Sequence, residues 1–145
     1  MRRFVKSVII DRPVETVFAY LSDFENESKW MPGVLKNSKI TDGPVGVGTR
    51  YLEVSNFMPL WRPRAVYEIT EYIANSKISF KSISGPNRFT GSCRVEQIDG
   101  RTRFTYLLDL HMRGLSLLEP LALRLFARRA KAGFEKLKRL VEASA

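Results

Sequence analysis

The feature that most constrains the fold is a change of hydrophobic period along the chain. Between Val34 and Met112, apolar and polar residues alternate with period two in six runs separated by turn sequences, which is the pattern of strands with one buried face. From Ser116 to Ala143 the apolar residues recur every three or four positions instead, as on one face of a helix. A sheet and a helix with one apolar face each must cover each other. The sequence therefore predicts an α+β fold.

The segment before the alternation predicts one further strand and two short helices. Phe4 to Asp11 is rich in β-branched residues, as strands are. Pro13 suits the first turn of a helix, and apolar residues follow it at i, i+3, i+4 and i+7 spacing. A second helical piece is expected from Phe24 to Lys29. Later in the chain, Asp99-Gly100 is a signal for a type I′ hairpin turn.

Composition excludes several kinds of site. The chain has one Cys and one His, too few for a disulfide framework, a multi-Cys zinc site, an iron–sulfur cluster or a Cys–Cys redox pair. The sequence also lacks a Ser-His-Asp set, a phosphate-binding loop and metal-ligand spacing. We therefore expect no cofactor and no metal.

Length and charge predict a single domain over residues 1–145, with 24 basic and 15 acidic residues and a formal charge of +9. No apolar run approaches the roughly 18 residues of a membrane-spanning helix. The basic start lacks the apolar stretch and cleavage site of a signal peptide. A cytoplasmic location is expected, with possible peripheral contact to a membrane.

The phase of each strand predicts which side chains face the long helix. In the strand from Tyr51 to Val54, the sequence does not decide which side chains face inward. Leu52 and Val54 facing inward is the simpler choice, and the alternative places Tyr51 and Glu53 inward.

Three motifs resemble those of the START-like superfamily, the helix-grip group that includes polyketide cyclases. They are Ile10-Asp-Arg-Pro-Val-Glu-Thr-Val-Phe-Ala-Tyr-Leu-Ser-Asp, Trp30-Met-Pro-Gly33 and Gly46-Val-Gly-Thr49. The resemblance implies a seven-stranded antiparallel sheet wrapped around a long C-terminal helix, with a hydrophobic ligand cavity between them. It also implies binding of lipids, polyketides, hormones or quinones, with catalysis in a minority of members. No catalytic residue carries over, because the superfamily has no universal catalytic motif.

Combining the strand phases with the resemblance gives a predicted cavity lining. Its members are Tyr67, Ile69, Phe80, Phe89, Cys93, Tyr106, Leu108, Leu110, Leu123, Phe126 and Ala130. The inward phenols need a hydrogen-bond partner, which a core group or a ligand oxygen would supply. If the chain is an enzyme, the candidate catalytic residues are Tyr67, Tyr106 and Glu53.

Other reactive side chains receive structural interpretations. His111 alternates with polar residues and is expected on the surface. Cys93 is expected to be a small core residue. The carboxylates of Asp11, Asp23, Glu25 and Glu27 are expected at helix starts or exposed turns, where capping explains them.

One end of the domain is predicted to carry a movable hydrophobic gate. In an antiparallel meander alternate loops share an end, which brings together the loop at residues 57–63 and the start of the long helix. The expected rim residues are Trp30, Phe57, Met58, Leu60, Trp61, Arg62, Arg113, Leu117 and Leu121. An apolar loop of this kind normally marks an interaction; plugging of the core is the alternative.

Three classes of function remain open at this stage. The first is a carrier or sensor that binds a small hydrophobic or lipid-like molecule. The second is a cyclase or dehydratase of the polyketide type, and the third is a basic interaction module on a ribosome or an anionic membrane surface. Specific nucleic-acid binding is not expected, because the aromatic residues point toward the helix. A monomer and a homodimer are both compatible with the sequence.

Overall fold

The computed structural model describes residues 2–56, 62–112 and 116–144. Seven strands, three α-helices and two 3-10 helices alternate along these residues. The N-terminal half contains β1 (Arg2–Ile10), α1 (Val14–Leu21), the 3-10 helix η1 (Phe24–Asn26), α2 (Glu27–Trp30), β2 (Val34–Lys39) and β3 (Arg50–Ser55). The C-terminal half contains β4 (Arg64–Ile73), β5 (Lys77–Ser84), β6 (Asn87–Ile98), β7 (Arg101–Met112), the 3-10 helix η2 (Ser116–Leu118) and α3 (Glu119–Ala143).

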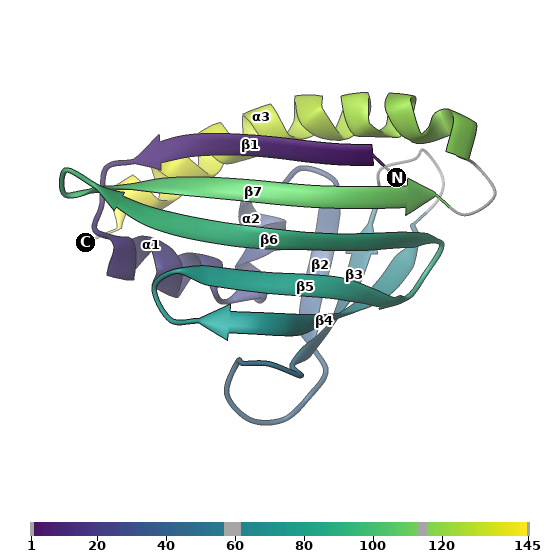
Figure 1. Cartoon of the computed structure of the whole chain (residues 1–145), viewed down its shortest axis with the longest axis horizontal. Helices are drawn as coiled ribbons and strands as arrows, with labels where there is room; N and C mark the ends of the chain where they lie inside the picture. The colour runs from purple at the N-terminus through teal and green to yellow at the C-terminus, as the bar shows by residue number, and fades with distance from the viewer. Residues whose placement is uncertain (1, 57–61, 113–115, 145) are drawn as a thin grey trace.

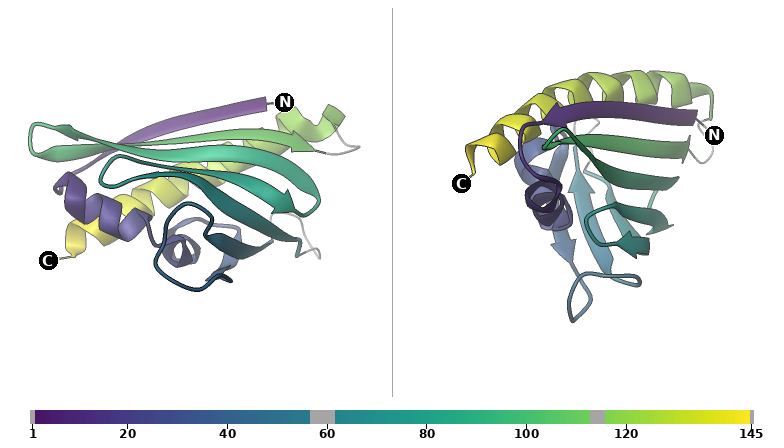
Figure 2. Two further views of the ribbon diagram at one scale, coloured as in Figure 1. Left: turned by 60° about the horizontal axis from the view of Figure 1, so that its bottom comes forward. Right: turned by 60° about the vertical axis from the view of Figure 1, so that its left-hand side comes forward.

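The strands form one antiparallel sheet in the order β1-β7-β6-β5-β4-β3-β2. β2 to β7 are a meander, and β1 pairs with β7 from Arg2↔Leu110 to Ile10↔Thr102. The sheet curls, and α3 runs across its concave side (Figures 1 and 2). This is the helix-grip arrangement that the resemblance to START-like proteins implies.

The β6–β7 hairpin turns where the sequence predicts it. Asp99 and Gly100 both have positive φ, 49° and 81°, as the two central residues of a type I′ turn require. Because this turn is tight, β6 and β7 remain in register from Ile98↔Arg101 to Asn87↔Met112. Their paired inner faces supply one wall of the space under α3.

The C-terminal half of α3 is tied to the first strand and the turn after it. Lys138 Nζ donates to the Ile9 carbonyl oxygen and to Glu142 Oε2, both over 2.8 Å. Glu142 Oε2 also accepts the Asp11 backbone N–H over 2.7 Å. Helix residues in this half are buried along one stripe, namely Ala130, Gly133, Phe134, Leu137 and Val141. This end of α3 is therefore anchored in the core.

Gly133 serves close packing of α3 against the α2–β2 connection. A Cβ at this position would lie 2.9 Å from both the Trp30 carbonyl oxygen and Pro32 Cδ. The absence of a side chain at Gly133 thus lets α3 approach the segment that follows α2.

Trp30 is anchored in the same region. Its ring packs edge-on against Phe134 and Phe104, with centroids 5.9 and 6.4 Å apart, and it is 5% exposed. Trp30, expected on the cavity rim, is buried among core rings, and it also borders the cavity described below. The short helices α1 and α2 thus reinforce the core.

Candidate functional site

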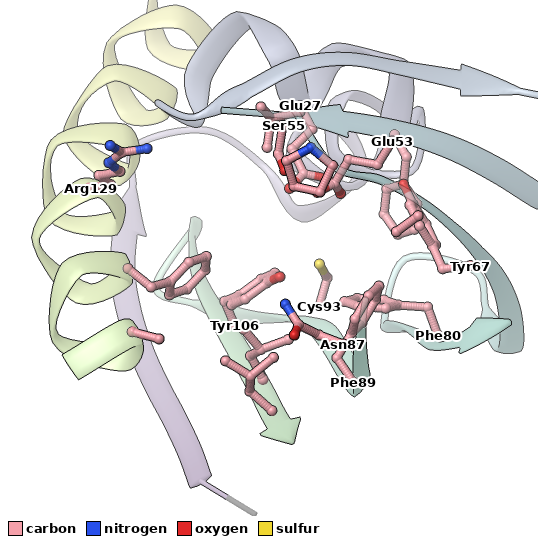
Figure 3. A pocket seen from close by; sticks show the side chains of 18 of the residues that line it. Glu27, Glu53, Ser55, Tyr67, Phe80, Asn87, Phe89, Cys93, Tyr106 and Arg129 are labelled. Atoms are coloured by element: carbon pink, nitrogen blue, oxygen red, sulfur yellow. The ribbon is translucent and has the colours of Figure 1, made fainter. Parts of the chain in front are cut away.

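A cavity of about 200 Å³ lies between the curled sheet and the N-terminal half of α3. Most of its wall is apolar, and the polar members come from separate elements (Figure 3). Glu27, Glu53 and Ser55 contribute from α2 and β3, Tyr67 from β4, and Arg129 from α3. Further polar members are Asp23, Asn87, Cys93 and Tyr106.

Eight of the side chains expected to line a cavity do border this one. They are Tyr67, Phe80, Phe89, Cys93, Tyr106, Leu108, Leu110 and Phe126. Ile69 is fully buried outside the lining, beside the turn at Thr49, whose carbonyl oxygen accepts the Ile69 N–H. Leu123 and Ala130 also lie outside the lining. The helix turns a different face to the cavity, with Ala122, Leu125, Phe126 and Arg129 bordering it.

The expected rim is described only in part. Phe57, Met58, Leu60, Trp61 and Arg113 lie outside the described residues. Arg62 is exposed. Leu117 on η2 and Leu121 on the first turn of α3 are 94% and 53% exposed. Pro63, which follows the undescribed segment, borders the cavity.

Glu53 reaches the cavity because of the pairing between β3 and β4. Tyr51 lies opposite Tyr67, and Glu53 lies opposite Ala65. Cross-strand partners share a face, so Tyr51 and Glu53 face inward with Tyr67. The simpler expectation, with Leu52 and Val54 inward, is wrong because Leu52 pairs with Val66 on the outer face.

Glu27 is the site residue that the sequence analysis missed. It lies three residues from both Phe24 and Trp30, which are buried, and this spacing places all three side chains on one face of the short helices. The Asn37 side-chain nitrogen donates to Glu27 Oε2 over 3.1 Å. Glu27 is therefore an inward group held by β2, and its interpretation as a capping or exposed residue is wrong. The two buried aromatic residues flanking it were the available signal.

Burial changes the acidity of both carboxyl groups. Removal from water raises the pKa of Glu53 to about 7. Burial, and then the nearby charge of Glu53, raise the pKa of Glu27 well above its usual range, partly opposed by the Asn37 hydrogen bond. Two carboxylates in one low-dielectric site cannot both ionise readily. Near neutral pH the Glu27–Glu53 pair, hereafter the carboxyl pair, therefore retains a proton.

Three buried polar atoms near the carboxyl pair make no hydrogen bond to the described part of the chain. They are the hydroxyls of Tyr51 and Tyr67 and the Asn37 side-chain oxygen. Tyr67 is 3% exposed and borders the cavity. Burial and then the charges of Glu27 and Glu53 raise its pKa well above the usual range, partly opposed by the neighbouring Asn37 side chain, and this keeps the phenol neutral. An unpaired buried donor of this kind is costly, and a ligand would relieve that cost.

Aromatic rings surround Tyr67. Its ring stacks on Tyr51, with centroids 5.4 Å apart and 15° between planes. The ring centroids of Phe24, Phe80 and Phe89 lie 5.9, 5.6 and 6.2 Å from that of Tyr67. The polar atoms of this side of the cavity are thus set in an aromatic wall.

The chain's lone His and Cys do not form a reactive set. His111 Nδ1 lies 3.1 Å from Glu119 Oε2, and neither residue borders the cavity. Burial raises the pKa of the Cys93 thiol, which disfavours the reactive thiolate. Within residues 2–56, 62–112 and 116–144, no group of three or more His, Cys, Asp or Glu could hold a metal ion. No helix in those ranges is both long and apolar enough to cross a membrane.

Comparison with known proteins then places the chain in a family. The sequence model of a family described as polyketide cyclase / dehydrase and lipid transport matches residues 1–142. The chain belongs to this family. Its cavity lies between sheet and helix, where the resemblance to START-like proteins predicts one. The comparison with curated proteins gave no match in sequence.

Solved structures share the fold at low sequence identity. TTHA0849 from Thermus thermophilus is 20% identical with a TM-score of 0.83, and 98% of each chain is covered. The Zhui aromatase/cyclase from Streptomyces sp. R1128 is 14% identical with a TM-score of 0.82, covering 97% of this chain and 93% of that one. A START superfamily protein from Mycobacterium smegmatis is 15% identical with a TM-score of 0.81, and 97% of each chain is covered.

Proposed function

We propose that the protein binds one small, largely apolar molecule in the cavity, with a polar group of that molecule against the carboxyl pair and Tyr67. The observation that carries the proposal is the unpaired, buried Tyr67 hydroxyl at a cavity whose other walls are mostly apolar. A few convergent polar groups in an apolar pocket are the usual pattern of a small-molecule site. The family description, which includes lipid transport, supports it.

The size of the cavity limits the ligand. Its volume is about 200 Å³, somewhat more than the ~150 Å³ of an engineered apolar cavity that holds benzene. A molecule with one ring or two fused rings, or with a short branched chain, is therefore the expected occupant. A long acyl chain would require the cavity to enlarge.

Comparison of two substitutions on opposite faces of β7 tests the binding function. Leu108 borders the cavity, and Leu107 lies next to it on the outer face of β7. Leu108→Trp fills the cavity, so we expect uptake of 1-naphthylmethanol, followed by its fluorescence, to weaken tenfold or more. Leu107→Trp adds the same bulk outside the cavity and should bind like the wild type. No uptake by the folded wild-type protein, with no ligand in native mass spectra, would refute the proposal.

A second candidate function is proton transfer on the bound molecule. It is favoured by the raised pKa of Glu53, about 7, since a general base works best near the ambient pH. One carboxylate would remove a proton from the carbon next to a ketone, breaking a C–H bond. The protonated partner would donate to the carbonyl oxygen, giving an enol. An enol of this kind can attack a second carbonyl carbon and close a ring, and an aromatase/cyclase is among the structural neighbours.

Deuterium exchange separates catalysis from binding alone. We expect the wild type to exchange the α-protons of 2-tetralone in D₂O, followed by proton NMR, much faster than buffer does. Glu53→Gln removes the base while retaining the shape of the side chain, and it should lose the acceleration. Equal exchange by wild type and Glu53→Gln would leave only the binding function.

A further inference from the structure

The polar side of the cavity is acidic. Glu27 and Glu53 both border it. Asn37, whose side-chain nitrogen donates to Glu27, is not part of the lining. Within the described chain, neither carboxyl forms an ion pair with Lys, Arg or His. A ligand that supplies donors and positive charge would complement this side best.

The cation on the cavity wall lies elsewhere. Arg129 borders the cavity from α3, across the open space from Glu27 and Glu53 (Figure 3). Among the described residues, the carboxyl pair therefore has no counter-ion beside it. A metal ion would need at least one more ligating group than the described residues bring together.

The aromatic wall also favours a cation. Tyr67, Phe80 and Phe89 border the cavity, and Phe24 stands beside Tyr67. The face of an aromatic ring attracts an organic ammonium group, with a contribution that grows when water is excluded. Carboxylates set among such rings combine both attractions.

We propose that the carboxyl pair and Tyr67 form an ammonium site, so that the ligand is an apolar amine whose protonated nitrogen lies against Glu27 and Glu53. This inference rests on the proposed binding function and names the class of its ligand. A carboxyl pair holding one proton carries a single negative charge, which one ammonium group balances. Tyr67 then gains a partner for its hydroxyl. The apolar body of the amine would fill the remainder of the cavity.

Other titratable groups face the pair from every neighbouring element. They are Asp23 before η1, Tyr67 on β4, Cys93 on β6, Tyr106 on β7 and Arg129 on α3. The phenols of Tyr67 and Tyr106 and the thiol of Cys93 have raised pKa values and stay neutral near physiological pH. Titration of the carboxyl pair therefore dominates the pH dependence of ligand binding between pH 6 and 8.

Three probes of matched shape test the ammonium site: 1-methylnaphthalene, 1-naphthylmethanol and 1-naphthylmethylamine. We expect the wild type at pH 7.5 to bind the amine at least tenfold more tightly than the alcohol, measured by fluorescence titration. Glu53→Gln and Glu27→Gln should each reduce the amine to the affinity of the alcohol and leave 1-methylnaphthalene unchanged. The amine should also bind more tightly at pH 8 than at pH 6, while the alcohol should not.

The outcomes distinguish this inference from the function on which it rests. Equal binding of amine and alcohol by the wild type, or an amine preference that survives in both folded Gln variants, overturns the ammonium site and leaves the binding function standing. Failure of all three probes to bind the folded wild type overturns both. Circular dichroism shows whether each variant is folded. Glu27 and Glu53 lie on different elements, so if one Gln variant fails to fold, the other still tests the ammonium site.

Discussion

The ring of Phe80 lies across Gly91, its partner on the neighbouring strand. A Cβ at residue 91 would lie 2.5 Å from Phe80 Cζ and 2.8 Å from the Leu107 carbonyl oxygen. Phe80 borders the cavity, and its ring can occupy that position because residue 91 has no side chain. The glycine therefore helps to set the shape of the cavity wall.

We expect Gly91→Ala to move the Phe80 ring into the cavity and to strain the β6–β7 backbone. The cost in unfolding free energy should be about 1–3 kcal/mol, as for other overpacked cores, and uptake of 1-naphthylmethanol should weaken. Gly46→Ala is the control, because a Cβ there meets nothing within 4 Å. Urea unfolding and probe titration measure the two effects. Unchanged uptake in a destabilised Gly91→Ala protein would mean that Phe80 moves away from the cavity.

The raised pKa of Glu53 makes stability depend on pH. The folded chain holds this proton up to about pH 7, and the unfolded chain releases it near 4.5. Since the folded state binds more protons in that window, stability falls as pH rises from 4.5 to 7. Glu53→Gln should therefore stabilise the protein by roughly 1–3 kcal/mol at pH 8 and by little at pH 4.5.

Urea unfolding at both pH values checks this expectation. Glu96→Gln serves as the control, since Glu96 is exposed on β6 and should change stability by about 0.5 kcal/mol or less at either pH. A Glu53→Gln gain that is the same at pH 4.5 and pH 8 would contradict a raised pKa. It would point to packing as the origin of the gain.

Tyr51 and Tyr67 form a matched pair for separating stability from binding. Both hydroxyls are buried without a partner among the described residues, and of the two only Tyr67 borders the cavity. Replacing either by Phe removes an unsatisfied polar group, so each variant should be stabilised by about 0.5–1.5 kcal/mol. Tyr67→Phe should also weaken binding of 1-naphthylmethanol, and Tyr51→Phe should not. Equal loss of affinity in both variants would show that the ring stack, rather than the Tyr67 hydroxyl, matters for binding.

The exposed start of α3 is expected to meet an anionic surface. Leu117 on η2 and Leu121 on α3 are exposed, as are Arg124 and Arg128 on α3. Basic amphipathic segments of this kind bind acidic lipid. The double variant Leu117→Gln with Leu121→Gln should keep its stability within about 0.5 kcal/mol per site and sediment less with phosphatidylserine vesicles. Leu140→Gln, at the other end of the helix, is the control. Equal sedimentation of the wild type, the double variant and Leu140→Gln with the vesicles would exclude a membrane role for this surface.

The fold could be predicted because its signals are local and agree with one another. Alternation defined the strands of the meander, Asp99-Gly100 defined a hairpin, and Pro13 marked the entry to α1. Each of these features depends on a few neighbouring residues. The sequence predicts that the long helix begins at Ser116, whereas α3 begins at Glu119. The three residues before it form the 3-10 helix η2.

The candidate site could be predicted less well because it depends on relations between elements. The inward phase of Glu53 is set by pairing with β4, as Tyr51 lies opposite Tyr67, and the β3 sequence alone fits either phase. Glu27 lies on a four-residue helix, too short for a periodic pattern to distinguish a buried face from a capping position. The rotation of α3 over the cavity is likewise fixed by its docking onto β1.

The place of β1 in the sheet has a consequence for the order of folding. The first strand pairs with the last, and Arg3 meets Asp109 across 106 residues of sequence, whereas each strand of the β2–β7 meander follows its partner directly. Closing so long a loop costs entropy that the meander does not lose. During synthesis β1 leaves the ribosome before β7, which pairs with its backbone, and before α3, whose Lys138 binds the Ile9 carbonyl oxygen. We therefore expect the nascent chain to be most prone to aggregation through β1 until the C-terminal helix has been made.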